Sequence, residues 1–440
     1  MGESRGLKLG SLVGIALGTV VGAGVVTVTG QAIASTGRSA WLAYMIATVA
    51  GFFMVVPYAL LANCIRPKGG NYTITAALLG KRWGGFIGIS AILIIFNMSL
   101  WGSGFGQYIN SLIPSVSQSM AGILGITFFF ILNMFGINKM SRVQNILSVI
   151  LFMGLVTFII LGIGNVKPEL ARPSSPEFMT GGTAGLGAAI TLLVSSTVGH
   201  KNIVNFTQNA VNSKRDVPKA LAITSAIILV LYVGIAFVNC TILPLEEVAG
   251  QSLTNVAKTI MPGTLFYLFI IGGPLAALST TINSGFAILS NPIRQAAKDG
   301  WFPKAIAKTN KNGAPYIAYA IAYVVGILPI LLGLSIRVIT NNIVLIVSIN
   351  EFIVFLAISQ LPKKIPEAWE KRYYRISKPV FYVGVGFAIA LRVLFIVLSL
   401  RNLTPILAGF TITLFVVFFM YATWMSRSER VDVKVSYELE

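Results

Sequence analysis

The chain has 440 residues, of which 55% are hydrophobic and only 11% are charged. About a quarter of the residues of a soluble domain are charged, so this composition excludes a water-soluble enzyme, a disordered chain and a nucleic-acid-binding domain. The formal net charge of +19 does not indicate a nucleic-acid-binding domain either, because the cytoplasmic loops of membrane proteins collect Lys and Arg. The composition predicts a protein of the lipid bilayer.

Residues suited to metal or redox chemistry are few. Cys64 and Cys240 both lie in apolar stretches, and His200 is the single histidine. A disulfide framework, a Cys-x-x-Cys site and a His-rich metal centre are therefore excluded, and we expect no metal and no cofactor. The same scarcity leaves little material for a membrane enzyme. A channel would need rings of like residues or an uninterrupted polar path, and neither is visible.

Twelve apolar runs have about the 20-residue length that a helix needs to cross a bilayer. The first run continues past the length of a signal peptide, so we interpret it as a retained span. The runs cover residues 9–36, 41–65, 86–113, 120–137, 141–164, 182–206, 220–243, 265–289, 318–334, 339–361, 380–400 and 405–425. The predicted fold is an all-α integral membrane protein with 12 transmembrane helices.

Basic residues are distributed unequally over the connections. If the N-terminal segment 1–8 is cytoplasmic, 25 of the 33 Lys and Arg residues fall on the cytoplasmic side, including those of the loop 362–379 and the tail 426–440. This asymmetry predicts that both termini are cytoplasmic. Residues 293–311, after the eighth span, place basic and apolar residues at helical spacing. They predict either an amphipathic helix on the inner leaflet or a solvated connector helix.

Two of the predicted spans are interrupted near mid-depth. Span 1 contains GTVVGAGVV at residues 18–26, although its small residues would also suit a close-packing surface. Span 6 contains SSTVGHKN at residues 195–202. Unpaired backbone and charge are costly in hydrocarbon, so such a stretch must be buried in protein or line a wet cavity.

The two interruptions lie five spans apart, as corresponding members of two repeats would. This spacing predicts inverted repeats over residues 9–164 and 182–361, with half-helix ends that bind a ligand at the midplane. The free N–H groups after Val21–Gly24 suit a carboxylate, and the carbonyls of the other half-helix suit an ammonium group or a cation. An α-amino acid carries both groups.

Four short motifs in the same order resemble those of the amino acid, polyamine and organocation (APC) transporter superfamily. Residues 17–26 (LGTVVGAGVV) are similar to its I-G-x-x-I-G-S-G-I-F string in helix 1, without the final Phe. Residues 67–72 (PKGGNY) resemble its Pro, Gly-Gly and Tyr signature at the end of helix 2. Residues 212–218 (NSKRDVP) and 298–303 (KDGWFP) are similar to N-P-x-R-x-x-P after helix 6 and R-D-G-x-x-P after helix 8. The resemblance implies the LeuT-like fold, a 5+5 inverted repeat with broken helices 1 and 6, here with two extra C-terminal helices over 380–425.

The sequence departs from this family at helix 6. Many relatives read G-F-E or G-W-N at the break, with an acidic pair some residues on. Here the break reads Gly199-His200-Lys201, and Gln208 and Asn209 stand where the pair would be. The site has gained a cation and lost acids.

Ion coupling is the second departure. Many relatives carry a lysine in helix 5 after a V-Q-N-like segment, but Leu151 occupies that position here. Sodium-coupled relatives use helix 1 carbonyls and helix 8 hydroxyls. In this chain these would come from Gly18 and Val21 and from Ser279, Thr280 and Thr281, although such hydroxyls often bond their own helix.

Lys201 and Glu351 are ionisable residues deep in predicted spans, where such groups are expensive and point to function. Three interpretations of Lys201 stand side by side: contact with a substrate carboxylate, pairing with Glu351, or loss of its proton as a coupling group. The adjacent His200 would project about 100° away, into a packing role. Arg392, in span 11, is expected to lie outside the core and to snorkel or pair locally.

The predicted site joins the two breaks. Its candidate substrate-binding residues are Val21, Gly22, Ala23, Gly24, Val25, Ser195, Ser196, Thr197, Gly199, Lys201 and Tyr232. The candidates for ion coupling are Gly18, Val21, Ser279, Thr280, Lys201 and Glu351. Asn97, Trp101 and Asn283 are further candidates for pocket walls, with structural hydrogen bonding as the alternative.

The resemblance implies a secondary active transporter that moves a small amino acid or related solute across the plasma membrane by alternating access. The alternatives are a transporter of an organic amine or carboxylate, and a nutrient sensor on a transporter scaffold. The expected partners are the solute, Na+ or H+, and the bilayer, with no nucleic acid and no obligate protein partner.

Overall fold

Apolar stretches of this length form helices because a helix pairs every backbone N–H and C=O group within its own segment. A computed structural model describes residues 7–67, 70–135, 140–170, 172–433 and 437–438. The α-helices of these residues are α1 (Leu9–Val20), α2 (Ala23–Thr36), α3 (Ala40–Ala62), α4 (Gly70–Leu79), α5 (Lys81–Ile94), α6 (Phe96–Leu112), α7 (Gln118–Met134), α8 (Met140–Ile163), α9 (Gly182–Thr197), α10 (Ser213–Thr241), α11 (Leu245–Val248), α12 (Thr254–Ile260), α13 (Gly263–Ile270), α14 (Ala276–Lys298), α15 (Tyr316–Leu331), α16 (Ile336–Ser359), α17 (Leu361–Lys364), α18 (Pro366–Glu370), α19 (Lys378–Asn402) and α20 (Pro405–Met425).

Shorter elements connect these helices. They are the 3-10 helices η1 (Gly37–Ser39), η2 (Gly199–Asn209) and η4 (Lys304–Ala307) and the π-helical turn η3 (Ile271–Leu275). Two short strands, β1 (Arg66–Pro67) and β2 (Tyr437–Glu438), pair antiparallel.

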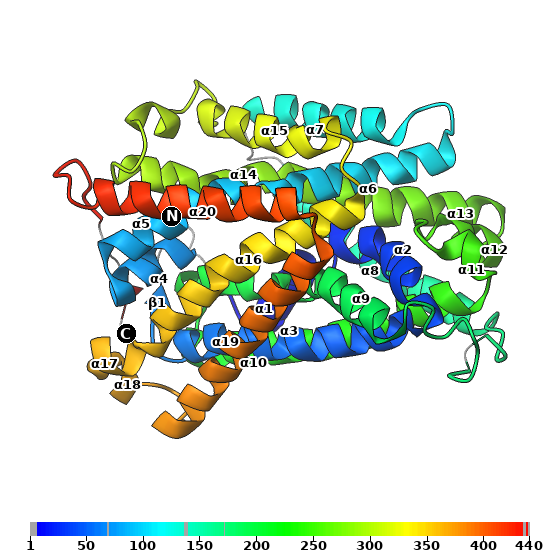
Figure 1. The fold of residues 1–440 in the computed structure, drawn as a ribbon, viewed down its shortest axis with the longest axis horizontal. Coiled ribbons are helices and arrows are strands. Elements are labelled where there is room, and N and C mark those ends of the chain that lie inside the picture. Colours follow the sequence, from blue (N-terminus) through cyan, green and yellow to red (C-terminus); the bar gives the residue numbers. More distant parts are fainter. Residues whose placement is uncertain (1–6, 68–69, 136–139, 171, 434–436, 439–440) are drawn as a thin grey trace.

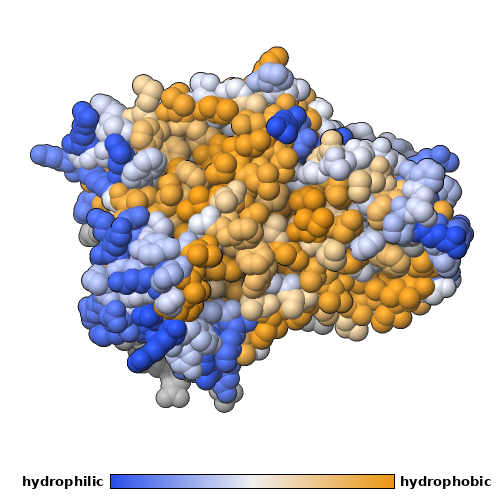
Figure 2. Space-filling view, turned by 60° about the horizontal axis from the view of Figure 1, so that its bottom comes forward, coloured by the Kyte–Doolittle hydropathy of each residue, from blue (hydrophilic) through white to orange (hydrophobic). Residues whose placement is uncertain are grey.

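Eight helical segments of the described residues are long and apolar enough to cross a membrane: Ala23–Ala62, Lys81–Leu112, Gly182–Val204, Ser213–Thr241, Gly263–Lys298, Ile336–Ser359, Lys378–Asn402 and Pro405–Met425. Four shorter apolar helices accompany them: Leu9–Val20, Gln118–Met134, Ile150–Ile163 and Tyr316–Leu331. Figure 2 shows apolar side chains in a broad band across the middle of the molecule, with polar side chains gathered at its two ends. These features define a multi-pass membrane protein.

Most of the long helices run side by side along the long axis of the molecule (Figure 1). Helix α3 packs against α10, α2 against α9, and α16 against α19. Helices α4, α17 and α18 lie at one end of the bundle, and α11 to α13 lie at the other (Figure 1).

The eighth predicted span, residues 265–289, contains a π-helical turn, and the helix that follows this turn extends beyond the predicted end. The π-helical turn η3 joins α13 to α14 around Pro274, which lacks the N–H group that a regular helix would use. Helix α14 then continues to Lys298, and the chain turns at Gly300, whose φ is 93°. The prediction of an amphipathic helix over residues 293–311 is therefore wrong as one element. Residues 293–298 end α14, and beyond the turn only the short η4 is helical within that range.

Two of the family-like motifs meet at one end of the bundle. The Tyr72 hydroxyl donates to Asp299 Oδ2 at 2.7 Å, and Trp301 Nε1 donates to the Tyr72 oxygen at 3.0 Å. The Trp301 ring is buried against Gly85, where an added Cβ would lie 2.2 Å from it. Burial raises the pKa of the Asp299 carboxyl above its ordinary value.

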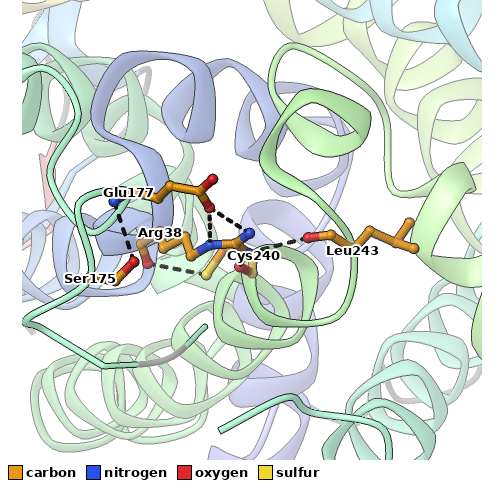
Figure 3. A network of polar contacts seen from close by, with 5 residues as sticks. All are labelled: Arg38, Ser175, Glu177, Cys240 and Leu243. Atoms are coloured by element: carbon orange, nitrogen blue, oxygen red, sulfur yellow. Dashed lines mark hydrogen bonds and ion pairs between the residues drawn. The ribbon is translucent and has the colours of Figure 1, made fainter. Parts of the chain in front are cut away.

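A buried arginine organises the opposite end (Figure 3). Arg38, in η1, forms an ion pair with Glu177 at 2.7 Å and donates to the carbonyl oxygens of Cys240 and Leu243. The Cys240 thiol donates to the Arg38 carbonyl at 3.2 Å. These contacts join the turn between α2 and α3 to the segment before α9 and to the end of α10.

Candidate functional site

The first membrane helix is interrupted, as the sequence predicts. Helix α1 ends at Val20 and α2 begins at Ala23, with Val21 (φ −80°, ψ 101°) and Gly22 (φ −169°, ψ −143°) in extended conformations between them. The N-cap residue of α2, Gly22, has no side chain to bond the start of the helix. As at every helix N-terminus, the first N–H groups have no partner within the helix, and they carry the positive end of the helix dipole.

The second interruption follows α9. The helix ends at Thr197, and Val198 leaves the helical conformation with ψ at 3°. The chain then continues as η2, a 3-10 helix of 11 residues. Such helices seldom exceed 3–4 residues, because their hydrogen bonds are poorly aligned. The segment that holds the predicted Gly199-His200-Lys201 string is thus an unusual element.

The two interruptions are in direct contact. A Cβ on Gly199 would lie 2.7 Å from the Thr19 carbonyl oxygen and 3.1 Å from Val20 Cα. A Cβ on Gly24 would lie 2.7 Å from Ser196 Cβ. Both distances are too short for a real side chain, so glycine is required where the backbones of α1, α2, α9 and η2 converge.

Tyr232 of α10 joins the ends of the two half-helices. Its hydroxyl lies 2.6 Å from the Val20 carbonyl oxygen, to which it donates, and 3.4 Å from that of Ser196. The ring is buried and packs edge-on against Tyr44 at 5.5 Å between centroids. Tyr232 therefore satisfies carbonyl groups that the breaks leave without helical partners.

The predicted substrate-binding residues divide by exposure. Gly22, Gly24, Ser195, Gly199 and Lys201 keep partial exposure. The remaining ones are buried: Val21, Ala23, Val25, Ser196, Thr197 and Tyr232.

The hydroxyls before the second break bond their own helix. Ser195 donates to the Leu192 carbonyl at 2.9 Å, and Thr197 donates to the Val194 carbonyl at 3.0 Å. Ser196 makes the same type of bond within α9. Of the predicted residues at this break, the partly exposed Gly199 and Lys201 do not bond back to α9 in this way.

The predicted hydroxyls of helix 8 lie on α14. Thr280 and Thr281 both donate to the Ala277 carbonyl, at 3.0 and 2.7 Å. Thr281 Oγ1 is the atom that a Cβ on Gly22 would meet, at 3.2 Å. The structure thus brings Thr281 to the first break, while Gly18 of α1 is exposed and Ser279 and Thr280 are partly exposed.

A buried charge cluster lies beside the second break. Glu351 of α16 pairs through Oε1 with Lys201 of η2 and through Oε2 with Arg392 of α19. The exposed fractions of these side chains are 2%, 14% and 2%. Of the three interpretations of Lys201, the structure shows the pairing with Glu351.

The prediction that Arg392 snorkels or pairs locally outside the core is wrong. Its guanidinium is buried, pairs with Glu351 across two helices and lies 5.8 Å from the centre of the Phe355 ring. The hydropathy pattern could not reveal this, because it does not fix the rotation of a helix about its axis.

The other polar mid-span residues are held by structural bonds. His200 Nε2 lies 2.8 Å from Ser225 Oγ on α10, as expected for a packing role. Asn283 accepts from Asn133 at 2.8 Å, and Asn97 donates to the Ile94 carbonyl at 2.8 Å. The Trp101 ring covers Gly285 of α14.

Comparisons with known proteins point in the same direction. A family model described as an amino acid permease matches residues 7–437. An uncharacterized protein of Methanocaldococcus jannaschii is 27% identical over 241 residues, which is 53% of each chain. The branched-chain amino acid permease BcaP of Bacillus subtilis is 24% identical over 311 residues, 64% of this chain and 65% of that protein. The lysine-specific permease LysP of Lactococcus lactis is 26% identical over 240 residues, 50% and 47% of the two chains.

The matches to the first two of these relatives span 53% and 65% of their lengths. A multi-pass bundle in which two interrupted helices meet has the form of a membrane transport protein. Since the family model covers nearly all of this chain, the chain belongs to the amino acid permease family, within the APC superfamily. The resemblance inferred from the four motifs is confirmed.

Proposed function

We propose that this permease is a secondary active transporter of a small amino acid, which it moves across the plasma membrane by alternating access. The observation that carries the proposal is the contact between the two interruptions, where Gly199 lies against Thr19 and Gly24 lies against Ser196. Half-helix ends that meet within a bundle offer both signs of backbone dipole to one small solute.

The solute's two charged groups would be bound by different half-helices. The uncapped N–H groups at the start of α2, next to the partly exposed Gly22 and Gly24, suit the α-carboxylate. The last carbonyls of α1 suit the α-ammonium group, although Tyr232 already occupies that of Val20. Glycine at both breaks lets the two segments approach each other closely, which brings their half-helix ends to one place.

The architecture we propose has 12 transmembrane spans in a LeuT-like 5+5 arrangement. The inverted repeats cover residues 9–164 and 182–361, and α19 and α20 follow them. This arrangement is supported by the positions of the two interrupted elements. The first repeat would begin with α1 and α2, and the second would begin with α9 and η2. The excess of basic residues in alternate connections supports cytoplasmic termini.

We propose that the structure represents an inward-facing state of the transporter. On the side away from the termini, the Gly250 N–H donates to the Gly30 carbonyl at 2.7 Å, and Gln31 and Gln107 both donate to the Gly250 carbonyl at 3.1 Å. These bonds close the far half of α2 against the segment that precedes α12. By contrast, Gly18 and Thr19 of α1 are exposed.

Na+ and H+ are the two candidate coupling ions, and each would use a different set of residues. Na+ would use carbonyls of Gly18 and Val21 with hydroxyls from Ser279, Thr280 or Thr281, of which Thr281 lies against Gly22. H+ would use the pair formed by Lys201 and Glu351. The contact of Thr281 with the break is the observation that keeps sodium a candidate.

Uptake into proteoliposomes tests the proposal. Purified protein is reconstituted and supplied with radiolabelled neutral, acidic or cationic amino acids, under an inward Na+ gradient, an inward H+ gradient or internal amino acid. We expect saturable uptake of at least one class, driven by one of these three conditions. A ligand that raises the melting temperature without any flux would identify a sensor instead. If the protein neither binds nor transports any amino acid, the proposal is overturned.

A further inference from the structure

The charge cluster of Lys201, Glu351 and Arg392 has more positive than negative members. Both oxygens of the Glu351 carboxylate are engaged, one by each cation. Among the residues that the structure describes, no second carboxylate pairs with Lys201 or Arg392. With all three groups ionised, one positive charge stays unbalanced in a buried place.

The neighbouring polar groups do not supply the missing negative charge. His200 is next to Lys201 in sequence but is directed to Ser225. Tyr58 of α3, a buried phenol, is the titratable group that faces Arg392 from another helix. Neither an imidazole nor a phenol carries a negative charge near neutral pH, so the excess positive charge of the cluster remains.

One member of the cluster, Lys201, lies close to the second break in the chain. Lys201 follows Gly199 by two residues, so their Cα atoms are at most about 7.6 Å apart. Gly199 in turn lies against Thr19 and Val20. Charges interact strongly over such distances inside a protein, because little water screens them.

We propose that this charge cluster makes the permease discriminate against amino acids with a cationic side chain, and that Arg392 sets the charge of the cluster. The inference rests on the proposed transport of amino acids and names the substrate class: neutral or acidic side chains are accepted, and lysine- and arginine-like ones are disfavoured. Arg392 acts through Glu351 and Lys201 and is a positioning residue. It lies on α19, outside the ten helices of the two repeats.

Three isosteric variants change the net charge of the cluster in defined steps. R392Q removes one positive charge, E351Q removes the negative charge, and E351Q/R392Q returns the sum to that of the natural protein. The measured quantity is the ratio of the apparent affinities for leucine and lysine, taken from competition with uptake of a labelled neutral amino acid and from thermal shift.

The charge model predicts the order of this ratio. E351Q should disfavour lysine most, the natural protein and E351Q/R392Q should be alike, and R392Q should disfavour lysine least, with steps on the order of tenfold for each unit charge. R392K should keep the natural ratio. R401Q, which removes an exposed arginine from the same helix, is the matched control and should also keep it.

A structural role of the cluster gives a different pattern. It predicts that all three cluster variants lose thermal stability and uptake together, with the double variant no better than the single ones and the leucine-to-lysine ratio unchanged. That result overturns the inference while leaving the proposed function intact. If E351Q does not fold, the comparison of R392Q with R392K and R401Q still decides between the two models. Failure of the natural protein to bind any amino acid overturns both proposals together.

Discussion

The Tyr232 hydroxyl donates to the carbonyl oxygen of Val20, the last helical residue of α1, across 2.6 Å. The same hydroxyl lies 3.4 Å from the Ser196 carbonyl oxygen, near the end of α9. One side chain of α10 thus contacts both interrupted helices at the point where each loses its regular backbone pairing. Movement of α1 relative to α9 has to break or re-form this contact.

Replacing Tyr232 with Phe removes the donor and keeps the ring. We expect a lower melting temperature, because a buried carbonyl left without a partner costs roughly 1–3 kcal/mol. Uptake should fall by about tenfold, as a loss of about 1.4 kcal/mol would give. Proteoliposome flux and thermal unfolding measure the two effects. Y267F, at an exposed tyrosine of α13, is the control, and equal behaviour of the two variants would contradict the role of Tyr232.

Replacing Gly199 with Ala tests the close approach of the two breaks. The new Cβ would lie 2.7 Å from a backbone oxygen of α1, so one of the two segments has to move. We expect uptake to be lost even if the protein is still purified in folded form. A Cβ on Gly187 of α9 would have no neighbouring atom within 4 Å, and G187A should transport normally. Normal flux in G199A would show that the breaks do not pack as described.

Replacing Arg38 with Gln tests the network that joins η1 to the end of α10. A buried ion pair that loses one partner costs several kcal/mol, but Glu177 is 46% exposed, so the loss here should be smaller, about 1–3 kcal/mol. The expected result is a clear fall in melting temperature. Arg337 is exposed, and R337Q should leave the melting temperature unchanged. A fall of the same size in both variants would show that the network is not the cause.

The buried Asp299 carboxyl predicts a pH dependence of stability. Burial raises its pKa in the folded protein, so the folded state holds the proton more tightly than the unfolded state. Its contribution is therefore favourable below the unfolded value of about 3.9 and is lost as the pH rises through the folded value. D299N keeps an acceptor for Tyr72 and should remove this loss. Melting curves from acidic to neutral pH measure it, and E429Q, at an exposed carboxylate, should behave as the natural protein does.

The two interruptions could be predicted because their cause is local. Glycines in span 1 and polar residues in span 6 are poor helix material in a membrane, whatever surrounds them. The observed breaks at Val21–Gly22 and Val198 lie within the two predicted strings. The predicted site between the breaks depends on the proposed repeats, because corresponding elements of two inverted repeats would meet at one axis.

The partners of individual side chains could not be predicted in the same way. Glu351 contacts residues 150 and 41 positions away in the sequence, and such pairs depend on how three helices are rotated and tilted. Hydropathy gives the depth of Arg392 but not the direction it faces. The hydroxyls of Ser195, Ser196 and Thr197 were candidates for a solute, yet within a helix the nearest acceptor is a carbonyl one turn back.

As a 3-10 helix, η2 is longer than the same residues would be as an α-helix. Its 11 residues rise by about 2.0 Å each in a 3-10 helix, whereas the same residues in an α-helix would rise by about 1.5 Å each. Rewinding the segment would therefore shorten it by about 5 Å, roughly one turn of an α-helix, without any change in its neighbours' own structure. Such a change would draw the start of α10 toward the end of α9, and Tyr232, carried on α10, would travel with it.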